Sequence, residues 1–399
     1  MNNNLLIKNI YHITRKDYLL VFLLLCISGN PLVDSFTEYI YIIVVVFLFV
    51  LSAKKKLPVP TGQIKYFFIV LFLLYVSQFF IVGDVSFPAD VNHFAKIYSG
   101  FLIIFLVGYK FRYVYLKVIT FLCIVSLVCF VANVIFGQFP GIEVDRNNSI
   151  LIYNYYPNSP GSRNCGMFWE PGAFQGYIML GFLMYMGDFR TFYMQHKRSF
   201  WILTIALITT FSTTGFIVFA LYLFFVFSGN IKKSPLMLIL TAALASGAVW
   251  AFYEYDFLGE KIIREYEEAM EISEGDVSWS RFGSAIIAWN NVLNHPFTGN
   301  GFKMTALYGE LAEYMEGMGN GFFGAMNQLG IPFILFYLFL LYKNAPTVSG
   351  LNRLGFIFLI VLLLNGEFFL NYPMFWALLF VKYPNLNLNG KISYTTYRA

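Results

Sequence analysis

The sequence predicts an all-α, polytopic membrane protein with about twelve transmembrane helices, and its composition and two patterns lead to this prediction. Hydrophobic residues make up 58% of the 399 residues and charged residues only 12%, whereas a soluble domain carries about 25% charged residues. The hydrophobic residues gather into long runs, and the charged residues between those runs sort by sign. We therefore expect a single integral membrane domain over residues 1–399.

The apolar runs place the predicted spans. A helix needs about 20 mostly apolar residues to cross a hydrocarbon core of about 30 Å. The predicted spans are residues 18–33, 37–53, 66–83, 94–111, 113–136, 171–187, 199–212, 214–229, 235–252, 319–342, 354–370 and 372–383. The first run has no A-x-A-like cleavage site, so we expect an uncleaved span and not a secretory signal.

The stretch 199–228 is interpreted as two short spans. One helix of 30 residues would be about 45 Å long, which exceeds the thickness of the hydrocarbon core. The Ser-Thr-Thr-Gly sequence at 212–215 is a suitable break. A single span would also move Lys232 and Lys233 to the side opposite the other basic loops. One strongly tilted helix is the alternative.

Charge sorting predicts the orientation. If the spans alternate, 20 of the 27 Lys and Arg residues lie on one side with only Asp17 and Asp188. The other 20 of the 22 Asp and Glu residues lie on the opposite side. The positive-inside rule assigns the basic side to the cytoplasm, so both termini are expected there. The short basic loops account for the net charge of +5, and nucleic acid is not expected as a partner.

The first outward loop, residues 137–170, ends at a charged pair. Pro171 and Gly172 suit the start of a helix, which places Glu170 at the N-terminus of the sixth span. One interpretation is that Glu170 only caps this helix, because the helix dipole favours a carboxylate there. The other is that Arg163 and Glu170 form a cation and carboxylate pair that binds a charged lipid head group and a hydroxyl nucleophile.

The second outward loop, residues 253–318, is acidic. Residues 257–272 place apolar side chains at helical spacing, so an amphipathic helix is expected there. A second helix is expected from Ser280, a suitable N-cap, to Pro296, which ends it. Arg281 then stands at a helix N-terminus, where a guanidinium and free N–H groups can share one anion. Alternatively, Arg281 is only a solvated side chain.

The cysteines and histidines indicate no metal site and no disulfide. Cys26, Cys123 and Cys129 lie in apolar runs, and Cys165 alone lies in an outward loop, where it lacks a partner for an intrachain disulfide. The four histidines are scattered, and no Cys and His cluster has the spacing of metal ligands. No cofactor is expected.

Four short patterns occur together in this chain. They are Arg163 to Gly172, with Gly166, Glu170 and Pro171; the Ser-Thr-Thr-Gly break at 212–215; the run from Ser280 to Phe302, with Arg281, Trp289 and His295; and Gly319-Asn320, followed by Leu329 to Pro332. With the hydropathy layout, these patterns resemble the O-antigen polymerase and ligase superfamily of bacterial membrane glycosyltransferases. They cover about a fifth of the chain, and Phe168 stands one place away from its position in the family pattern.

The resemblance implies an all-α fold of the glycosyltransferase C type, acting at the periplasmic face of the bacterial inner membrane. It implies that undecaprenyl diphosphate-linked O-antigen repeat units are the substrates and that transfer is independent of a metal. It also implies inner-membrane lipid, a chain-length regulating co-polymerase and a flippase as partners. Residues 137–170 and 253–318 are then periplasmic loops.

A departure from the family pattern favours one of its branches. Ligases carry a His-containing motif near the outer end of the late span, whereas residues 316–322 contain no histidine. We therefore expect a polymerase that joins repeat units in lipopolysaccharide biosynthesis, with an O-antigen ligase acting on lipid A-core as the alternative. An alternative of another class is a flippase or transporter of lipid-linked oligosaccharides. Transporters usually need ionisable residues inside the membrane, and nearly all charges here lie at span ends or in loops.

The chemistry that the resemblance implies suggests a role for each candidate residue. Departure of the donor leaving group puts charge on a diphosphate, which positioned arginines can stabilise, and Arg163 and Arg281 are the candidates. A base must reach the acceptor hydroxyl. Glu170 is the first candidate for this base, and Glu367, at the outer end of the eleventh span, is the second. Three further residues are expected to contact substrate: Asn320, Trp169 and His295.

Overall fold

The computed structural model describes residues 13–35, 39–53, 62–83, 85–137, 141–144, 147–155, 163–228, 281–308, 319–346 and 350–381, with residues 263, 267, 385–386 and 392–393. This part of the chain is mostly helical with a few short strands, which agrees with the predicted all-α class.

The first half of the described chain is a series of helices. They are α2 (Arg15–Cys26), α3 (Pro31–Asp34), α4 (Ile40–Ser52), α5 (Gln63–Ile81), α6 (Phe87–Val107) and, after the 3-10 turn η1 (Gly108–Lys110), α7 (Phe111–Phe136). A capping box between Thr14 and Asp17 begins α2. Asp17 also pairs with Lys110 at 2.7 Å. This ion pair ties the start of α2 to the turn between α6 and α7.

The second half is also helical. Its elements are α8 (Pro171–Leu183), η2 (Met186–Asp188), α9 (Phe189–Thr209), α10 (Thr213–Ser228), α13 (Arg281–Val292), α14 (Met304–Tyr308), α15 (Gly321–Leu329), α16 (Ile331–Asn344), α17 (Gly350–Gly366), η5 (Phe369–Asn371), α18 (Pro373–Ala377) and η6 (Leu378–Phe380). Strands β4 (Asn385–Leu386) and β5 (Ile392–Ser393) pair near the C-terminus.

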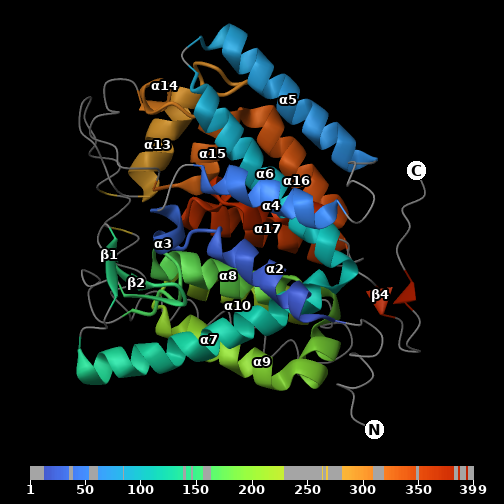
Figure 1. Ribbon diagram of the computed structural model, residues 1–399, viewed down its shortest axis with the longest axis vertical. Helices are drawn as coiled ribbons and strands as arrows, with labels where there is room; N and C mark the ends of the chain where they lie inside the picture. Colours follow the sequence, from blue (N-terminus) through green and yellow to red (C-terminus); the bar gives the residue numbers. More distant parts are fainter. Residues whose placement is uncertain are drawn as a thin grey trace.

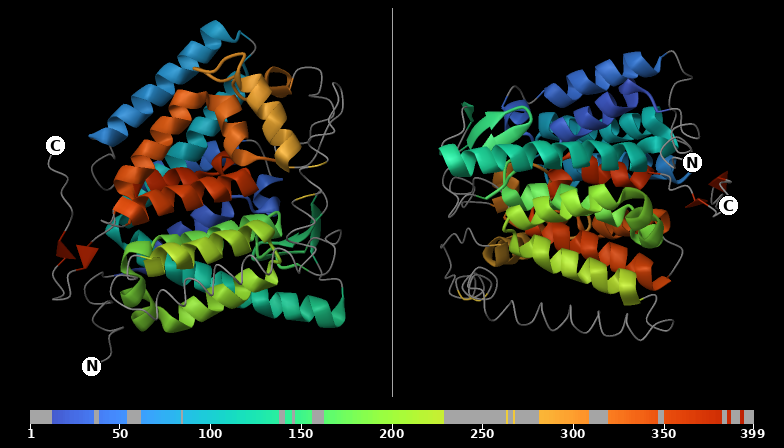
Figure 2. Two further views of the ribbon diagram at one scale, coloured as in Figure 1. Left: turned by 180° about the vertical axis from the view of Figure 1, so that it is seen from behind. Right: turned by 90° about the horizontal axis from the view of Figure 1, so that it is seen from below.

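The helices pack side by side in a bundle (Figures 1 and 2). α4 packs on α6, α2 packs on α6 and α7, and α7 packs on α9. In the other part of the bundle, α10 packs on α8 and α17, and α15 contacts α13, α16 and α17. Contacts therefore link α8, α10, α13, α15 and α17, although their residues are far apart in the sequence.

The described helices have a membrane character. By length and composition, two helical segments among the described residues can cross a membrane, Gln63–Ile81 and Phe87–Phe136. A third candidate is the pair α15 and α16, which are bent by 120° at the break between them. Three shorter helices are also apolar: Ile40–Ser52, Thr213–Phe227 and Gly350–Gly366. The count of about twelve spans stays a prediction.

The predicted break in the stretch 199–228 is confirmed. α9 ends at Thr209 and α10 begins at Thr213. Between them, Phe211 has a φ of 45°, a left-handed conformation that residues with a side chain rarely adopt. Three further predictions lie outside the described residues: the span 235–252, the helix over 257–272 and the N-cap at Ser280.

Four predicted spans have the wrong extent. Residues 18–33 form α2 and the separate short helix α3. Residues 319–342 form α15 and α16, because Gly330 turns the chain at a φ of 80° and Pro332 lacks the N–H that a continuing helix needs. Residues 372–383 contain only α18 and η6, and α17 ends at Gly366. Glu367 therefore lies beyond the helix and not within a span over 354–370.

A small antiparallel sheet occupies the loop 137–170, where no strand was predicted. β2 (Asn147–Ile150) pairs with β1 (Ile142–Val144) on one side and with β3 (Tyr153–Tyr155) on the other. The amide of Asn154 donates a hydrogen bond to the Phe168 carbonyl at 2.7 Å. Strands of three or four residues are too short for alternation to reveal them in a sequence. The sheet thus supports the segment that leads to Glu170.

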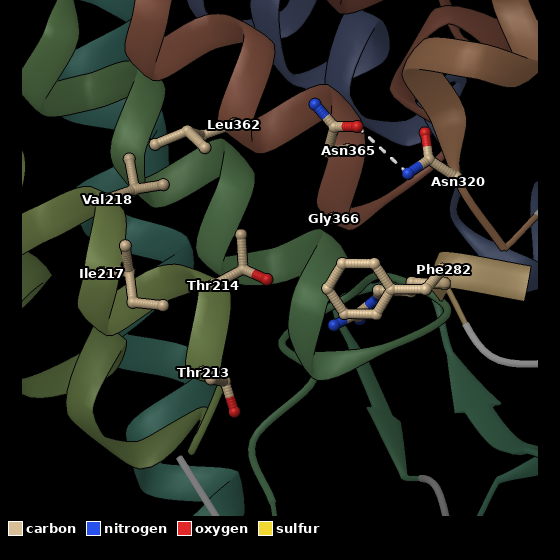
Figure 3. A pocket seen from close by; sticks show the side chains of 10 residues that line it. Thr213, Thr214, Ile217, Val218, Phe282, Asn320, Leu362, Asn365 and Gly366 are labelled. Atoms are coloured by element: carbon tan, nitrogen blue, oxygen red, sulfur yellow. Dashed lines mark hydrogen bonds between the residues drawn. The ribbon is translucent and has the colours of Figure 1, made fainter. Parts of the chain in front are cut away.

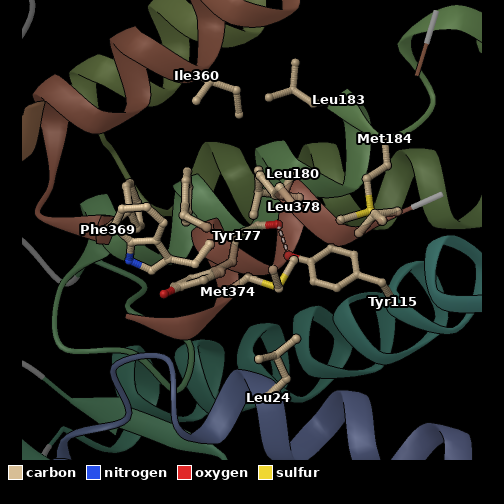
Figure 4. Close-up of a cluster of buried hydrophobic side chains, with 14 of the residues drawn as sticks. Leu24, Tyr115, Tyr177, Leu180, Leu183, Met184, Ile360, Phe369, Met374 and Leu378 are labelled. Carbon is tan, nitrogen blue, oxygen red and sulfur yellow. Dashed lines mark hydrogen bonds between the residues drawn. The ribbon is translucent and has the colours of Figure 1, made fainter. Parts of the chain in front are cut away.

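The core around α8 combines aliphatic, methionine and aromatic side chains (Figure 4). The hydroxyl of Tyr115 donates to the carbonyl oxygen of Tyr177 at 2.7 Å, and the Tyr177 hydroxyl donates to the carbonyl oxygen of Ser28 at 2.6 Å. Both tyrosines are fully buried, and both hydroxyls have the partners that buried polar groups need. These bonds hold α8 against α7 and the end of α2, which determines where the start of α8 lies.

Candidate active site

Glu367 lies at the centre of the candidate site. It follows α17 directly, and only 6% of the residue is exposed. Glycines make room for it: a Cβ on Gly172, in the first turn of α8, would overlap the Glu367 carboxylate, and a Cβ on Gly321 would overlap the Glu367 carbonyl oxygen. The carboxylate therefore lies against the N-terminus of α8, where the helix dipole favours negative charge.

Arg281 pairs with this carboxylate. It begins α13, and its Nη2 lies 3.1 Å from Glu367 Oε1. The two side chains are 28% and 8% exposed, respectively, so Arg281 reaches from a buried carboxylate toward the surface. This is the one ion pair of Arg281 among the described residues, and a guanidinium has five N–H donors. Donors therefore remain for an anionic ligand.

Arg163 is fixed at the break between α9 and α10. Its Nε donates to the carbonyl oxygen of Thr210 at 3.0 Å, and its Nη2 donates to the carbonyl oxygen of Phe211 at 2.9 Å. A basic side chain is favourable at the carboxyl end of a helix, where carbonyl groups lack helical partners. Arg163 therefore has a structural role as a cap of α9, in addition to any contact with a substrate.

Glu170 occupies the N-cap position of α8, as the sequence predicts. Its carbonyl oxygen accepts a hydrogen bond from the Phe174 N–H at 3.1 Å, which starts the helix. Its side chain makes no capping hydrogen bond, and the residue is exposed. The carboxylate therefore does not act as a hydrogen-bonding cap, and it is accessible to a ligand.

The four charged residues influence one another electrostatically. Burial and the nearby Glu170 raise the pKa of Glu367 to about 8, against the opposing effect of Arg281 and Arg163. Burial lowers the pKa of Arg163, and the positive charge of Arg281 acts in the same direction. An arginine nevertheless stays charged at neutral pH. The structure thus brings together the two predicted arginines and the two predicted carboxylates.

A cavity of about 300 Å³ lies beside Arg281 (Figure 3). Polar side chains from α10, α13, α17 and the N-cap of α15 line part of its wall, and apolar side chains from α10, α13 and α17 line the rest. The lining residues are Thr213, Thr214, Ile217, Val218, Arg281, Phe282, Asn320, Leu362, Asn365 and Gly366. A mainly apolar pocket with a few placed polar groups is typical of a small-molecule site.

Asn320, one of the residues expected to contact substrate, lines this cavity. Its Nδ2 donates to Asn365 Oδ1 at 3.0 Å, and its Oδ1 accepts hydrogen bonds from the N–H groups of Phe322 and Phe323. The side chain is thus the N-cap of α15 and also lines the cavity.

The structure does not bring Trp169 and His295 into the cavity wall. The Trp169 ring stacks on Tyr372 at 4.7 Å, and a Cβ on Gly29 would overlap it, so Trp169 packs in the interior. His295 lies three residues beyond α13, whose 12 residues begin at Arg281. A helix of that length spans about 18 Å, which separates His295 from Arg281.

Three polar lining residues had no predicted role. Thr213 and Thr214 belong to the Ser-Thr-Thr-Gly break, which the sequence marked only as an interruption of two spans. Asn365 is a polar residue at the end of a long apolar run, directly before Gly366 and Glu367. That position is the signal that could have identified it, because a polar side chain in an apolar helix needs a partner.

Among the described residues, no three His, Cys, Asp or Glu side chains gather where they could hold a metal ion. The chain matches no protein-family model and no curated protein. The likeness to the O-antigen polymerases therefore rests on the short patterns quoted above, and the chemistry of this site has to be argued from its own residues.

Proposed function

We propose that this chain is an O-antigen polymerase. It joins undecaprenyl diphosphate-linked oligosaccharide repeat units at the periplasmic face of the bacterial inner membrane. The observation that carries the proposal is the convergence of Arg163, Glu170, Arg281 and Glu367, which come from segments far apart in the sequence and interact electrostatically. Of the four, Arg281 lines the cavity. Two cations suit a diphosphate leaving group, and an exposed carboxylate suits the activation of a hydroxyl group.

The proposed transfer uses these groups in distinct roles. The bond between the anomeric carbon of the donor and the diphosphate oxygen breaks, and its electron pair leaves on the diphosphate, whose charge Arg281 and Arg163 stabilise. The hydroxyl oxygen of the acceptor forms a new bond to that carbon, and its proton passes to Glu170. Glu367 is buried in its ion pair, so its role is to position Arg281.

The expected setting follows from the same proposal. The apolar helices support an integral membrane protein, and charge sorting places both termini in the cytoplasm. The arginines supply positive charge at the leaving group, so the proposed transfer is independent of a metal. A chain-length regulating co-polymerase and a flippase that delivers repeat units are the proposed protein partners.

The lipopolysaccharide of a deletion strain tests this function against its alternatives. Loss of a polymerase leaves one repeat unit on each core, because ligation of single units continues. Loss of a ligase leaves cores without any repeat unit, and loss of a flippase leaves no repeat unit of any length at the surface. Gel electrophoresis of the lipopolysaccharide separates these outcomes, and only the first agrees with the proposal.

A further inference from the structure

A second cavity, of about 310 Å³, lies on the other side of the Glu367 turn. Its wall is formed by α6, α14, the end of α15 and the residues after Glu367, namely Phe368 and Asn371. Gly366 lines the first cavity and Phe368 lines the second. Gly366 and Phe368 are separated by one residue, so their Cα atoms are at most about 7.6 Å apart. The turn that carries Glu367 therefore separates two neighbouring cavities.

A buried charge lies in the wall of this second cavity. Lys96 is in the middle of α6, only 9% exposed, and its Nζ donates to Asn371 Oδ1 at 2.9 Å. This is the one hydrogen bond of Lys96 among the described residues, and its Nζ also lies 4.8 Å from the centre of the Tyr41 ring and 5.9 Å from that of the Tyr372 ring. Sequence analysis placed Lys96 at the outer end of the predicted span 94–111, whereas α6 begins already at Phe87, so the structure places Lys96 in the middle of a helix. An ionisable residue inside such a helix indicates a functional site.

Two neighbours of Lys96 carry polar atoms without a partner. Asn92 Oδ1 and His93 Nε2 are buried and have no hydrogen-bond partner in the described part of the chain. The other ring nitrogen of His93 is within 2.7 Å of the Tyr75 hydroxyl. Buried polar atoms are almost always paired, so these two require an explanation. A ligand with several hydroxyl groups explains both, because a hydroxyl can donate and accept.

Aromatic rings complete the wall. The Phe302 ring lies 4.4 Å from the His93 ring, and Phe302 and Phe368 both line the cavity. The face of an aromatic ring carries partial negative charge, and it attracts the polarised C–H groups on one face of a sugar ring. The volume corresponds to about ten water molecules, which is enough for one sugar ring and too small for a whole repeat unit.

We propose that the second cavity is the acceptor site, which takes the terminal non-reducing sugar of the incoming repeat unit. Lys96, Asn92 and His93 bind its hydroxyl groups, and Phe302 packs against its ring. This proposal rests on the polymerase function proposed above and adds the location of the second substrate. The acceptor hydroxyl then approaches the donor from the opposite side of the Glu367 turn.

The test uses an acceptor that cannot act as a donor. The full-length protein in lipid nanodiscs receives a saturating diphosphate-lipid donor and increasing amounts of the repeat-unit glycan carrying a phenyl group in place of the diphosphate lipid. Asn92→Leu removes the amide with little change of shape. Asn133→Leu is the matched control, because Asn133 Oδ1 is also buried without a partner in the described residues but lines neither cavity.

We expect Asn92→Leu to raise the KM for the phenyl glycoside by about tenfold, the order expected for a lost hydrogen bond. The kcat of Asn92→Leu and its KM for the donor should stay within about twofold of the parent. All kinetic constants of Asn133→Leu should also stay within about twofold. An unchanged acceptor KM, or an increase in the donor KM instead, would overturn the assignment.

Failure of the polymerase function itself gives a different result. The parent protein would then form no product from donor and phenyl glycoside, whatever the variant. Saturation-transfer NMR with the phenyl glycoside still decides the acceptor site in that case. Transfer to the sugar protons in the parent, lost in Asn92→Leu and kept in Asn133→Leu, supports the site. Equal transfer in all three proteins contradicts it.

Discussion

Arg281 and Arg163 have partners of different kinds, and this difference determines what each substitution removes. Arg281 donates a hydrogen bond to the buried Glu367 side chain, so its loss leaves Glu367 without this partner in the interior. Arg163 binds two main-chain carbonyl groups, so its loss leaves the end of α9 without a cap. In the proposed transfer, both also bind the diphosphate. Experiments therefore have to separate a loss of protein stability from a loss of diphosphate binding.

We predict that Arg281→Ala and Arg163→Ala each abolish long O-antigen chains. Removal of one positioned charge from a leaving group costs about 10²-fold in rate or more. Arg→Lys at either position should restore only part of the activity, because lysine lacks the bidentate fork. In vitro ladders at matched protein levels measure the effect, with Arg190→Ala, an exposed arginine on α9, as the control. Normal ladders from both alanine variants would show that the site is wrong.

The exposed Glu170 and the buried Glu367 should respond differently to the same isosteric change. If Glu170 is the base, Glu170→Gln lowers kcat by about 10²-fold or more with little loss of thermal stability. If the only role of the Glu170 charge is its favourable interaction with the helix dipole, the same variant loses at most about 1 kcal/mol of stability and polymerises normally. Glu367→Gln should mainly raise the KM for the donor, because Glu367 positions Arg281 and Arg281 binds the diphosphate in the proposed transfer. If Glu170→Gln is active and Glu367→Gln shows no turnover, Glu367 and not Glu170 is the base.

The raised pKa of Glu367 predicts a pH dependence of stability. Its pKa rises from 4.5 to about 8 on folding, so the folded state binds a proton more tightly than the unfolded state. The contribution of this group to the free energy of unfolding is therefore full below about pH 4.5 and is lost as the pH rises to about 8. We expect the Tm to fall over this range and to fall less in Glu367→Gln. Glu143→Gln, on exposed β1, serves as the control, and equal slopes for all three proteins would contradict the prediction.

At the scale of the elements, the start of α8 determines the geometry of the site. Gly172 allows the Glu367 carboxylate to approach the first turn of this helix. Gly181 lies in the same helix, but a Cβ there would meet its nearest neighbour at 3.4 Å, an ordinary contact distance. The two glycines lie in the same helix and differ in what an added methyl group would displace.

We predict that Gly172→Ala abolishes polymerisation, because the added Cβ displaces Glu367 and with it Arg281. Gly181→Ala should keep activity within about threefold of the parent, since in a helix interior alanine is more favourable than glycine by about 1 kcal/mol. In vitro ladders and Tm values for the two variants measure the difference. Equal activity of both would show that the position of Glu367 is unimportant for the reaction.

The sequence predicted several of these elements because their signals are local. Pro171 and Gly172 marked the start of α8, and the Ser-Thr-Thr-Gly sequence marked the break before α10. Elements without a local signal were missed or wrongly bounded. The sheet in 137–170 has strands that are too short to show a period. The bend between α15 and α16 does have a local signal, Gly330 and Pro332, but the apolar residues on both sides of it were interpreted as one span.

At the scale of the whole molecule, the charge distribution predicts one orientation in the membrane. A reporter fused after Lys233 should be cytoplasmic, and one fused after Glu274 should be periplasmic. Both positions lie outside the described residues, so the experiment tests the orientation and not the fold. Two crossings before Lys233 require separate helices there, and α9 ends at Thr209 while α10 begins at Thr213. The opposite pair of results would reverse the location of the acidic loop.

Composition, hydropathy and charge sign by themselves determined the class of the protein, because a membrane acts on each residue through its own polarity. They also identified four charged candidates, since proline, glycine and charged residues stand out in an apolar chain. Only the tertiary structure decided that Arg163, Glu170, Arg281 and Glu367 lie together. It also decided that Lys96 lies in a cavity wall. Such proximity depends on how helices distant in the sequence pack, and no local pattern encodes that packing.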